Sequence, residues 1–192
     1  MRKNRRLRGI VLLGIGILLL LSAGVWYISN VLEDKKAGEY ANIVLSKMDE
    51  IVWKEDVSNA GDVSFVTVEQ ESYCGRVVIE KLGIELPVFA EWNYNNLKKA
   101  PCRYMGNADT NDMIIAAHNY RSHFGELKTL QIGDEIVFRD VADEVHRFAV
   151  KELVLLDGMA VEDMTSGEWD FTLFTCTKGG KQRVTVRCER VE

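Results

Sequence analysis

Cys176 and Arg183 stand seven residues apart, on either side of a Gly-Gly pair. The segment Thr172–Cys176 and the segment that begins at Arg183 both alternate in the manner of strands, and Gly179-Gly180 between them predicts a two-residue hairpin turn. In that register Cys176 faces Arg183, and directly opposed side chains on antiparallel strands have Cβ atoms about 4.5–5.5 Å apart. The spacing therefore predicts a thiol beside a guanidinium.

The same register divides the hairpin into two faces. One face is predicted to belong to the core, and it carries Phe171, Leu173, Thr175, Val184, Val186 and Cys188. The other face is predicted to be a reactive surface, and it carries Thr172, Phe174, Cys176, Arg183, Thr185 and Arg187. Arg187 opposes Thr172, four residues from Cys176 and about 13 Å away along the strand, so Arg183 is the partner of the thiol.

Acyl chemistry at a thiol also needs a group that protonates the leaving amine, and histidine is the usual one. His118 directly follows the apolar run 113–117, which places it at the mouth of a buried strand. His123, in a polar loop, is expected to be a solvated structural residue, and His146 a residue of a strand surface. The spacing of His118 and His123 fits no common zinc motif, so we predict neither a metal nor a cofactor.

Taken together, Thr-Leu-x-Thr-Cys, a following Arg and an upstream strand that ends in Ala-His-Asn resemble the sortases, cysteine transpeptidases of the outer face of Gram-positive bacteria. The resemblance runs from about Gly75 to Val191 and is of the class B or class D type. It implies catalytic roles for Cys176, His118 and Arg183, and an eight-stranded closed β-barrel. It further implies that Cys176 cleaves a C-terminal Leu-Pro-x-Thr-Gly-like signal of a surface protein and passes the acyl group to an amine of a wall precursor or a pilin lysine.

Substrate binding is predicted around the thiol. The loop from Asp157 to Asp170 is rich in Met, Trp and acids and leads directly into the Cys176 strand, and the resemblance implies that it helps to read the sorting signal. The residues expected to bind substrate are Trp169, Met164, Thr172, Thr175 and Asn119. Three other aromatic residues, Trp92, Tyr94 and Tyr104, are expected to serve packing.

Strand patterning begins at Gly75 and agrees with a mainly β fold. Short helices are expected at 94–99 and 125–130, and strands at 75–80, 84–89, 101–105, 112–117, 134–140, 144–155, 171–177 and 181–191. Many short strands with few helices favour a closed antiparallel-rich barrel. Upstream, residues 33–54 have apolar positions at helical spacing and predict a stalk helix, and the polar, acidic segment 57–72 predicts an extended linker.

The N-terminus predicts a membrane anchor. Five basic residues precede an uncharged run from Gly9 to Ile28, whose twenty residues rise about 30 Å as a helix. The basic residues favour a single span with the N-terminus inside and the domain on the extracellular face, giving a tail at 1–8, a span at 9–28, a stalk and linker at 29–72 and a catalytic barrel at 73–192. A cleaved signal peptide ending near Leu21–Gly24 is the alternative, and either reading exports the domain.

The charge and the cysteine content of the chain restrict its possible functions further. Without the five basic residues before the span, 19 of the 24 Lys and Arg remain against 29 Asp and Glu, which argues against nucleic-acid binding. Of the four cysteines one must stay free as the nucleophile, and we expect no essential disulfide. Two alternatives stay open, namely a cysteine peptidase that uses water as acceptor and a barrel that binds peptide or wall polymer without chemistry.

Overall fold

The computed structural model describes residues 2–52, 58–60, 63–166 and 168–191. The chain divides into two compact units, Met1–Lys35 and Lys36–Glu192. The elements of these units, in chain order, are α1 (Arg2–Val52), β1 (Ser58–Ala60), β2 (Val63–Val68), β3 (Glu71–Ile79), η1 (Glu80–Leu82), β4 (Ile84–Phe89), α2 (Tyr94–Leu97), β5 (Cys102–Met105), β6 (Met113–Ala117), η2 (Leu127–Thr129), β7 (Glu135–Asp140), β8 (Val145–Asp157), α3 (Val161–Met164), β9 (Phe171–Cys176) and β10 (Gln182–Arg190).

The first unit is part of α1 and is apolar on its surface. Its large hydrophobic side chains are exposed, from Ile10 at 67% to Leu32 at 51%. Among the described residues, one helical stretch, Gly9–Ile51, contains a segment long and apolar enough to cross a membrane. This agrees with the predicted span at 9–28 in length and composition.

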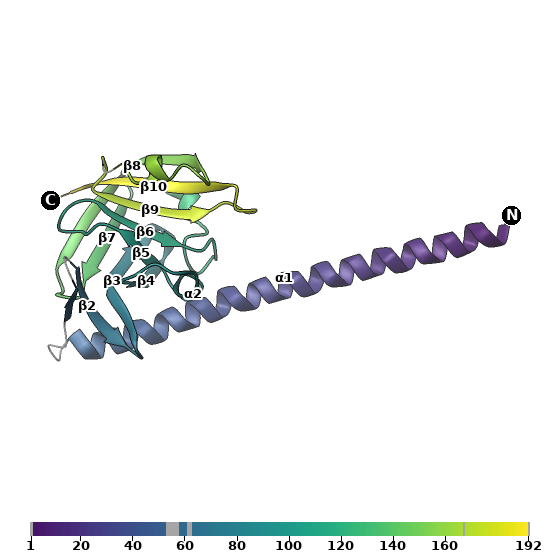
Figure 1. The fold of residues 1–192 in the computed structure, drawn as a ribbon, viewed down its shortest axis with the longest axis horizontal. Coiled ribbons are helices and arrows are strands. Elements are labelled where there is room, and N and C mark those ends of the chain that lie inside the picture. The colour runs from purple at the N-terminus through teal and green to yellow at the C-terminus, as the bar shows by residue number, and fades with distance from the viewer. Residues whose placement is uncertain (1, 53–57, 61–62, 167, 192) are drawn as a thin grey trace. The chain divides into compact units, whose positions relative to one another are not determined.

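The second unit is built on a closed β-barrel (Figure 1). The strands from β3 to β10 follow one another in the order β3-β4-β5-β6-β9-β10-β8-β7, and β7 pairs with β3 to close the ring. Each predicted strand from 75–80 to 181–191 corresponds to one of these eight strands, and α2 and η2 lie where short helices were expected. The predicted eight-stranded closed barrel is therefore confirmed.

Two pairings in the ring are parallel, and both arise from crossovers in the chain. β4 pairs with β5 through Phe89 and Cys102, and β6 pairs with β9 over five consecutive residue pairs, from Met113–Phe171 to Ala117–Thr175. The β6–β9 pairing brings residues almost 60 positions apart in the sequence to adjacent places. The residues that follow β6 and the residues that end β9 therefore lie at the same edge of the sheet.

The barrel is filled by the inward-facing residues of the alternating strands. The rings of Phe148 and Phe171 stack with centroids 4.3 Å apart, and Leu173, Val186 and Cys188 are fully buried beside them. The core face predicted for the 171–188 hairpin is thus confirmed. The burial of Cys188 raises the pKa of its thiol, so this cysteine acts as a small apolar core residue.

A second apolar cluster joins the end of α1 to the barrel. Val44 and Met48 of α1 pack with Val66 and Val68 of β2, and the phenolic hydroxyls of Tyr40 and Tyr73 are hydrogen-bonded at 2.6 Å. The predicted stalk helix therefore packs on the domain.

The segment predicted as an extended linker carries the strands β1 and β2, which add to the sheet beside the start of β3. Period-two apolar residues at 66 and 68 supply the buried contacts of β2. The predicted end of the stalk helix near Lys54 and the start of the linker at Val57 lie outside the described residues.

Candidate active site

Cys176 and Arg183 are directly opposed across the β9–β10 ladder, as the sequence predicts. The turn itself is wider than the predicted two-residue turn. The Thr177 amide donates to the Gln182 carbonyl at 2.9 Å, and the Gly180 amide donates to the Thr177 carbonyl at 2.8 Å. The chain thus reverses over residues 178–181, with Gly179 and Gly180 both at positive φ. The register is unaffected because the extra residues are added symmetrically on the two strands.

The parallel pair β6–β9 brings His118 to the same place. The last pair of this ladder is Ala117 with Thr175, so the next residues along the two strands are His118 and Cys176. Neighbouring strands lie about 4.8 Å apart, so the end of β6 directs the chain at His118 toward the end of β9 that carries Cys176. The Thr175 hydroxyl donates to the Ala117 carbonyl at 2.8 Å and ties the two strands together at this level.

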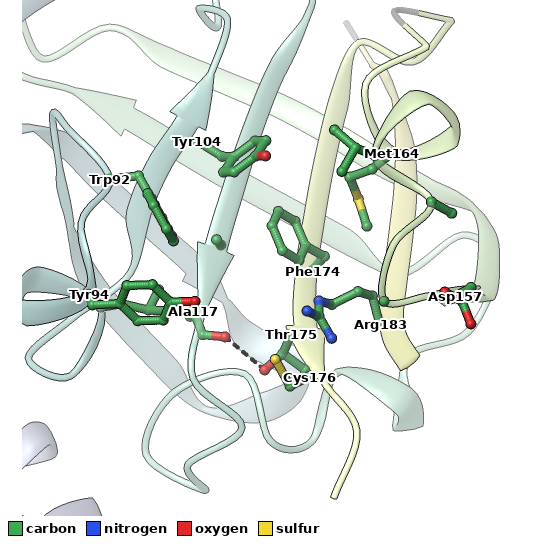
Figure 2. A pocket seen from close by; sticks show the side chains of 15 residues that line it. Trp92, Tyr94, Tyr104, Ala117, Asp157, Met164, Phe174, Thr175, Cys176 and Arg183 are labelled. Atoms are coloured by element: carbon green, nitrogen blue, oxygen red, sulfur yellow. Dashed lines mark hydrogen bonds between the residues drawn. The ribbon is translucent and has the colours of Figure 1, made fainter. Parts of the chain in front are cut away.

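Cys176 opens into a cleft of about 220 Å³ on the outer face of the barrel (Figure 2). Cys176 and Arg183 lie at one end of it, and the guanidinium of Arg183 lies beside the thiol. The remaining lining is mostly apolar and consists of Trp92, Tyr94, Leu97, Tyr104, Ala116, Ala117, Asp157, Gly158, Ala160, Val161, Met164, Phe174 and Thr175. An apolar cleft with a few polar groups at one end is typical of a site for a peptide or small ligand.

Aromatic residues form one wall of this cleft. The ring centroids of Trp92 and Tyr94 are 5.2 Å apart, those of Trp92 and Tyr104 are 6.0 Å apart, and those of Tyr104 and Phe174 are 5.5 Å apart. Trp92 and Tyr94 are 39% and 70% exposed. These rings pack on one another, as predicted, but the prediction missed that they line the cleft. The sequence signal that was available is two aromatic residues, Trp92 and Tyr94, within the polar segment between β4 and β5.

The segment between β8 and β9 forms the opposite wall. Gly158 donates its amide to the Lys181 carbonyl at 2.9 Å, and a Cβ at this position would lie 3.3 Å from Nη1 of Arg183. Arg183 in turn donates from Nη1 to the Gly180 carbonyl at 2.8 Å. The absence of a side chain at Gly158 therefore leaves room for the guanidinium, and the hairpin turn holds one of its nitrogens.

The predicted substrate-binding residues are distributed over three places. Met164 and Thr175 line the cleft, although the Thr175 hydroxyl is engaged with Ala117. Thr172 and Trp169 line a separate hollow of about 40 Å³ that shares Met164 with the cleft, and the Trp169 ring lies under the Arg187 guanidinium. Asn119 and His118 belong to the loop after β6 rather than to the cleft lining.

The other two histidines are buried, so their predicted solvent exposure is wrong. His123 is 1% exposed and contacts the Tyr120 ring, and His146 is 5% exposed. His123 precedes the fully buried Phe124. His146 lies on the inward face of β8 with Phe148 and Val150, between the exposed residues Val145 and Arg147.

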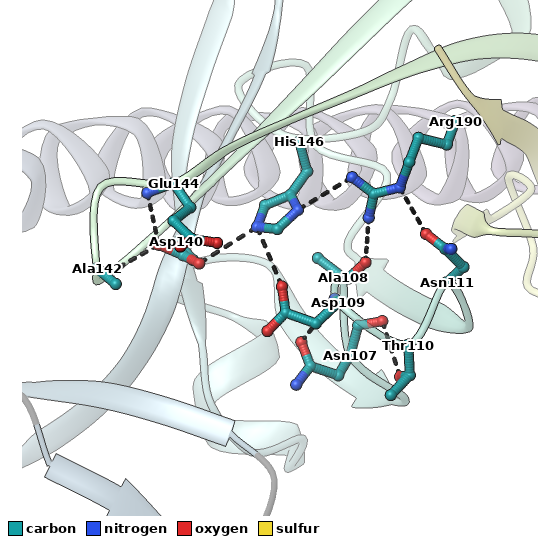
Figure 3. A network of polar contacts seen from close by, with 10 residues as sticks. All are labelled: Asn107, Ala108, Asp109, Thr110, Asn111, Asp140, Ala142, Glu144, His146 and Arg190. Carbon is teal, nitrogen blue, oxygen red and sulfur yellow. Dashed lines mark hydrogen bonds and ion pairs between the residues drawn. The ribbon is translucent and has the colours of Figure 1, made fainter. Parts of the chain in front are cut away.

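His146 belongs to a polar network at the other end of the strands (Figure 3). Its Nε2 is 3.2 Å from Asp140 Oδ2, and its Nδ1 is 3.2 Å from Nη1 of Arg190. Arg190 also donates from Nε to the Asn111 side chain at 2.6 Å. Asp109, Asp140, Glu144 and His146 offer polar atoms within 4.8 Å of one another. Because His146 contacts Asp109, Asp140 and Arg190, and Arg190 also bonds Asn111, the network holds the end of β10 against two turns.

Comparison with known proteins agrees with this fold. Residues 77–191 match the model of the sortase domain. No curated protein sequence matches the chain.

Solved structures of class C sortases share the fold at low identity. Sortase C1 of Streptococcus suis has a TM-score of 0.54 and 24% identity, over 62% of this chain and 73% of that chain. A Clostridium perfringens sortase C with the C-terminal cell wall sorting motif has a TM-score of 0.55 and 20% identity, over 62% and 71%. Sortase C2 of Group B Streptococcus pilus island 1 has a TM-score of 0.56 and 20% identity, over 66% and 77%. At these identities the likeness concerns the fold, and the class B or class D type stays a prediction.

Proposed function

Because the chain belongs to the sortase family, we propose that it is a membrane-anchored cysteine transpeptidase in which Cys176, His118 and Arg183 act together. One observation carries this proposal: Cys176 is opposed to Arg183 on one side and adjoins the strand that ends before His118 on the other, at the end of an apolar cleft. A barrel that only binds peptide has no need for this combination of groups.

The proposed reaction has two acyl transfers. The Cys176 thiolate attacks the carbonyl carbon of the scissile peptide bond, the C–N bond breaks, and His118 gives its proton to the departing amine. An incoming amine then loses a proton to His118 and attacks the thioester, the C–S bond breaks, and the Cys176 thiolate and protonated His118 are restored. Arg183 donates to the oxygen that gains negative charge in both tetrahedral intermediates. Nη1 is held by the Gly180 carbonyl, and Nη2 and Nε are the donors we assign to this task.

Cysteine burial supports Cys176 as the nucleophile. Burial raises the pKa of Cys74 and of Cys102 to about 12, and it raises that of Cys188 as well. A buried neutral thiol is a poor nucleophile, whereas Cys176 is partly exposed and lines the cleft.

We further propose that the acyl donor is a C-terminal Leu-Pro-x-Thr-Gly-like signal of a surface protein and that the acceptor is an amine of a wall precursor or a pilin lysine. The apolar walls of the cleft suit the uncharged residues that precede the scissile bond. The exposed apolar helix supports a span at 9–28, with the basic tail 1–8 inside and the stalk, linker and barrel (29–72 and 73–192) outside.

Product analysis tests the proposed reaction. The full chain is incubated with a Leu-Pro-Glu-Thr-Gly peptide, with and without a glycine or lysine amine, and the products are identified by mass spectrometry. We expect a peptide–amine conjugate that requires Cys176 and is lost in Cys176→Ala. Hydrolysis alone at saturating amine would favour a peptidase that uses water, and bound but uncleaved peptide would favour a binding module.

A further inference from the structure

Three aromatic rings contact one another in the loop that follows β6. The ring centroids of His118 and Tyr120 are 4.9 Å apart with their planes at 32°, and those of Tyr120 and His123 are 5.5 Å apart with their planes at 49°. His123 is 1% exposed, and the next residue, Phe124, is fully buried in the barrel core. Tyr120 thus contacts both the imidazole beside the nucleophile strand and an imidazole that the fold holds in the interior.

Backbone hydrogen bonds fix this loop on both sides of Tyr120. The Tyr120 carbonyl accepts the amides of His123 at 3.0 Å and Gly125 at 2.8 Å, and the His118 carbonyl accepts the amide of Phe124 at 3.2 Å. A Cβ at Gly125 would lie 2.7 Å from the Tyr120 carbonyl oxygen, so the loop closes this tightly only with glycine there. The Tyr120 backbone therefore has one defined position relative to the end of β6.

The β6–β9 ladder directs the chain at His118 but does not orient its imidazole. β6 ends at Ala117, and the imidazole of His118 keeps two side-chain torsions that the ladder does not set. A general acid works only within hydrogen-bond reach of the group to which it gives its proton, and small misplacements are costly. An aromatic face at 4.9 Å limits the orientations that the imidazole can adopt.

We propose that Tyr120 is a positioning residue whose flat ring, anchored through His123 and the loop backbone, orients the imidazole of His118 toward Cys176. This rests on the proposed function, in which His118 transfers the proton. Tyr120 lies outside the lining of the cleft, so its contribution falls on kcat rather than on the KM for the acyl donor. The alternative role for Tyr120 is packing alone, which any apolar side chain of similar volume fulfils.

Two substitutions at Tyr120 separate these roles in the full chain. Tyr120→Met keeps apolar volume but removes the flat ring, and Tyr120→Phe keeps the ring but removes the hydroxyl. With a Leu-Pro-Glu-Thr-Gly peptide as donor, we expect Tyr120→Met to lower kcat by about tenfold to a hundredfold with KM unchanged. Tyr120→Phe should restore most of kcat. Equal kcat in the wild type and Tyr120→Met would overturn the proposal, as would equal losses in both variants, which would assign the effect to the hydroxyl.

A spectroscopic readout makes the test independent of the substrate. In histidine-labelled protein, the ring protons of His118 carry a ring-current shift from Tyr120, which we expect Tyr120→Phe to keep and Tyr120→Met to abolish. An unmoved His118 signal in Tyr120→Met would contradict the contact. Should Tyr120→Met not fold, His123→Leu removes the anchoring ring and should lower kcat with the same change in the His118 signal. A wild type that leaves the peptide intact would overturn the proposed function, and the His118 signal would still decide the role of Tyr120.

Discussion

At the scale of single residues, Arg183 and Arg187 lie on the same strand but make different contacts. Both lie on the outer face of β10, but only Arg183 is opposed to Cys176. Arg187 pairs with Glu152 at 2.8 Å, donates to the Asp163 carbonyl at 2.7 Å and covers the Trp169 ring. Its contacts hold the β8–β9 segment in place, whereas Arg183 remains beside the thiol.

This distinction predicts opposite effects of the same substitution. Arg183→Lys replaces a planar set of donors by a point charge, and loss of one oxyanion donor typically costs about 10²–10³ in kcat. Arg187→Lys should lower the thermal stability of the protein, because a single ammonium cannot keep the geometry of the two bonds that the guanidinium makes to Glu152 and to the Asp163 carbonyl. It should leave the rate of acylation largely intact. Steady-state kinetics and thermal unfolding of both variants check this, and a larger kcat loss in Arg187→Lys would contradict the assignment.

At the scale of elements, the site depends on two pairings of different sequence range. The β9–β10 hairpin is local, so alternation and a Gly-Gly pair are sufficient to predict its register. The β6–β9 pairing joins strands that are almost 60 residues apart, and no local pattern specifies which strands become neighbours. That the end of β6, just before His118, pairs with the strand of Cys176 was therefore available only from the family motif.

The elements that line the cleft were harder to predict for the same reason. Trp92 and Tyr104 reach the thiol face because β4, β5 and β6 are neighbours in the barrel, which is a property of the closed sheet. The burial of His123 and His146 likewise depends on the elements packed around them. The core face of β9, by contrast, follows from period-two alternation alone.

The connection between β4 and β5 is predicted to bind the acyl donor through its aromatic wall. Trp92→Ala removes an exposed ring from the lining without disturbing the strand pairs that hold Cys176 and His118. We expect the KM for the peptide to rise about tenfold, which corresponds to about 1.4 kcal/mol of lost contact, while Cys176 is alkylated by iodoacetamide at the wild-type rate. An unchanged KM would mean that the opposite wall, between β8 and β9, accounts for recognition of the donor.

At the scale of the whole molecule, the four cysteines divide between the core and the cleft. Cys74, Cys102 and Cys188 are buried in apolar clusters, and the four thiols are free. The pKa values of these three thiols are raised by burial, so the folded state keeps them protonated at a pH where the unfolded chain ionises them. The unfolded state then binds fewer protons, and the free energy of unfolding falls as the pH rises.

This loss of stability should begin above the ordinary thiol pKa, near pH 9, and continue toward the raised values. Each buried thiol contributes a slope of about 1.4 kcal/mol per pH unit once it ionises in the unfolded chain. Urea unfolding at pH 7 to 10.5 measures the slope, and Cys188→Ala should make it shallower than in the wild type. An identical slope in that variant would show that other groups, such as buried Tyr73, cause most of the loss of stability at alkaline pH.

The N-terminal helix leads to a prediction about processing in the cell. Ala23→Leu removes a small residue from Leu21–Gly24, the segment that resembles a signal-peptidase cleavage site. If residues 9–28 form a retained anchor, the wild type and the variant in the membrane fraction differ in mass only by the substitution itself, and both keep the basic tail. A wild-type protein that is shorter than the variant by the N-terminal segment would show cleavage instead.

The most direct test of the account is the mass of the covalent intermediate. The full chain is quenched in acid during turnover of a Leu-Pro-Glu-Thr-Gly peptide without added amine, and its intact mass and fragments are measured. We predict an adduct on Cys176 with the mass of the acyl part of the peptide, and we expect hydroxylamine to remove it. The amount of this adduct should be smaller in His118→Ala and in Arg183→Lys. Cleavage of the peptide with no adduct, or with an adduct on another residue, would contradict the assignment of Cys176 as the nucleophile.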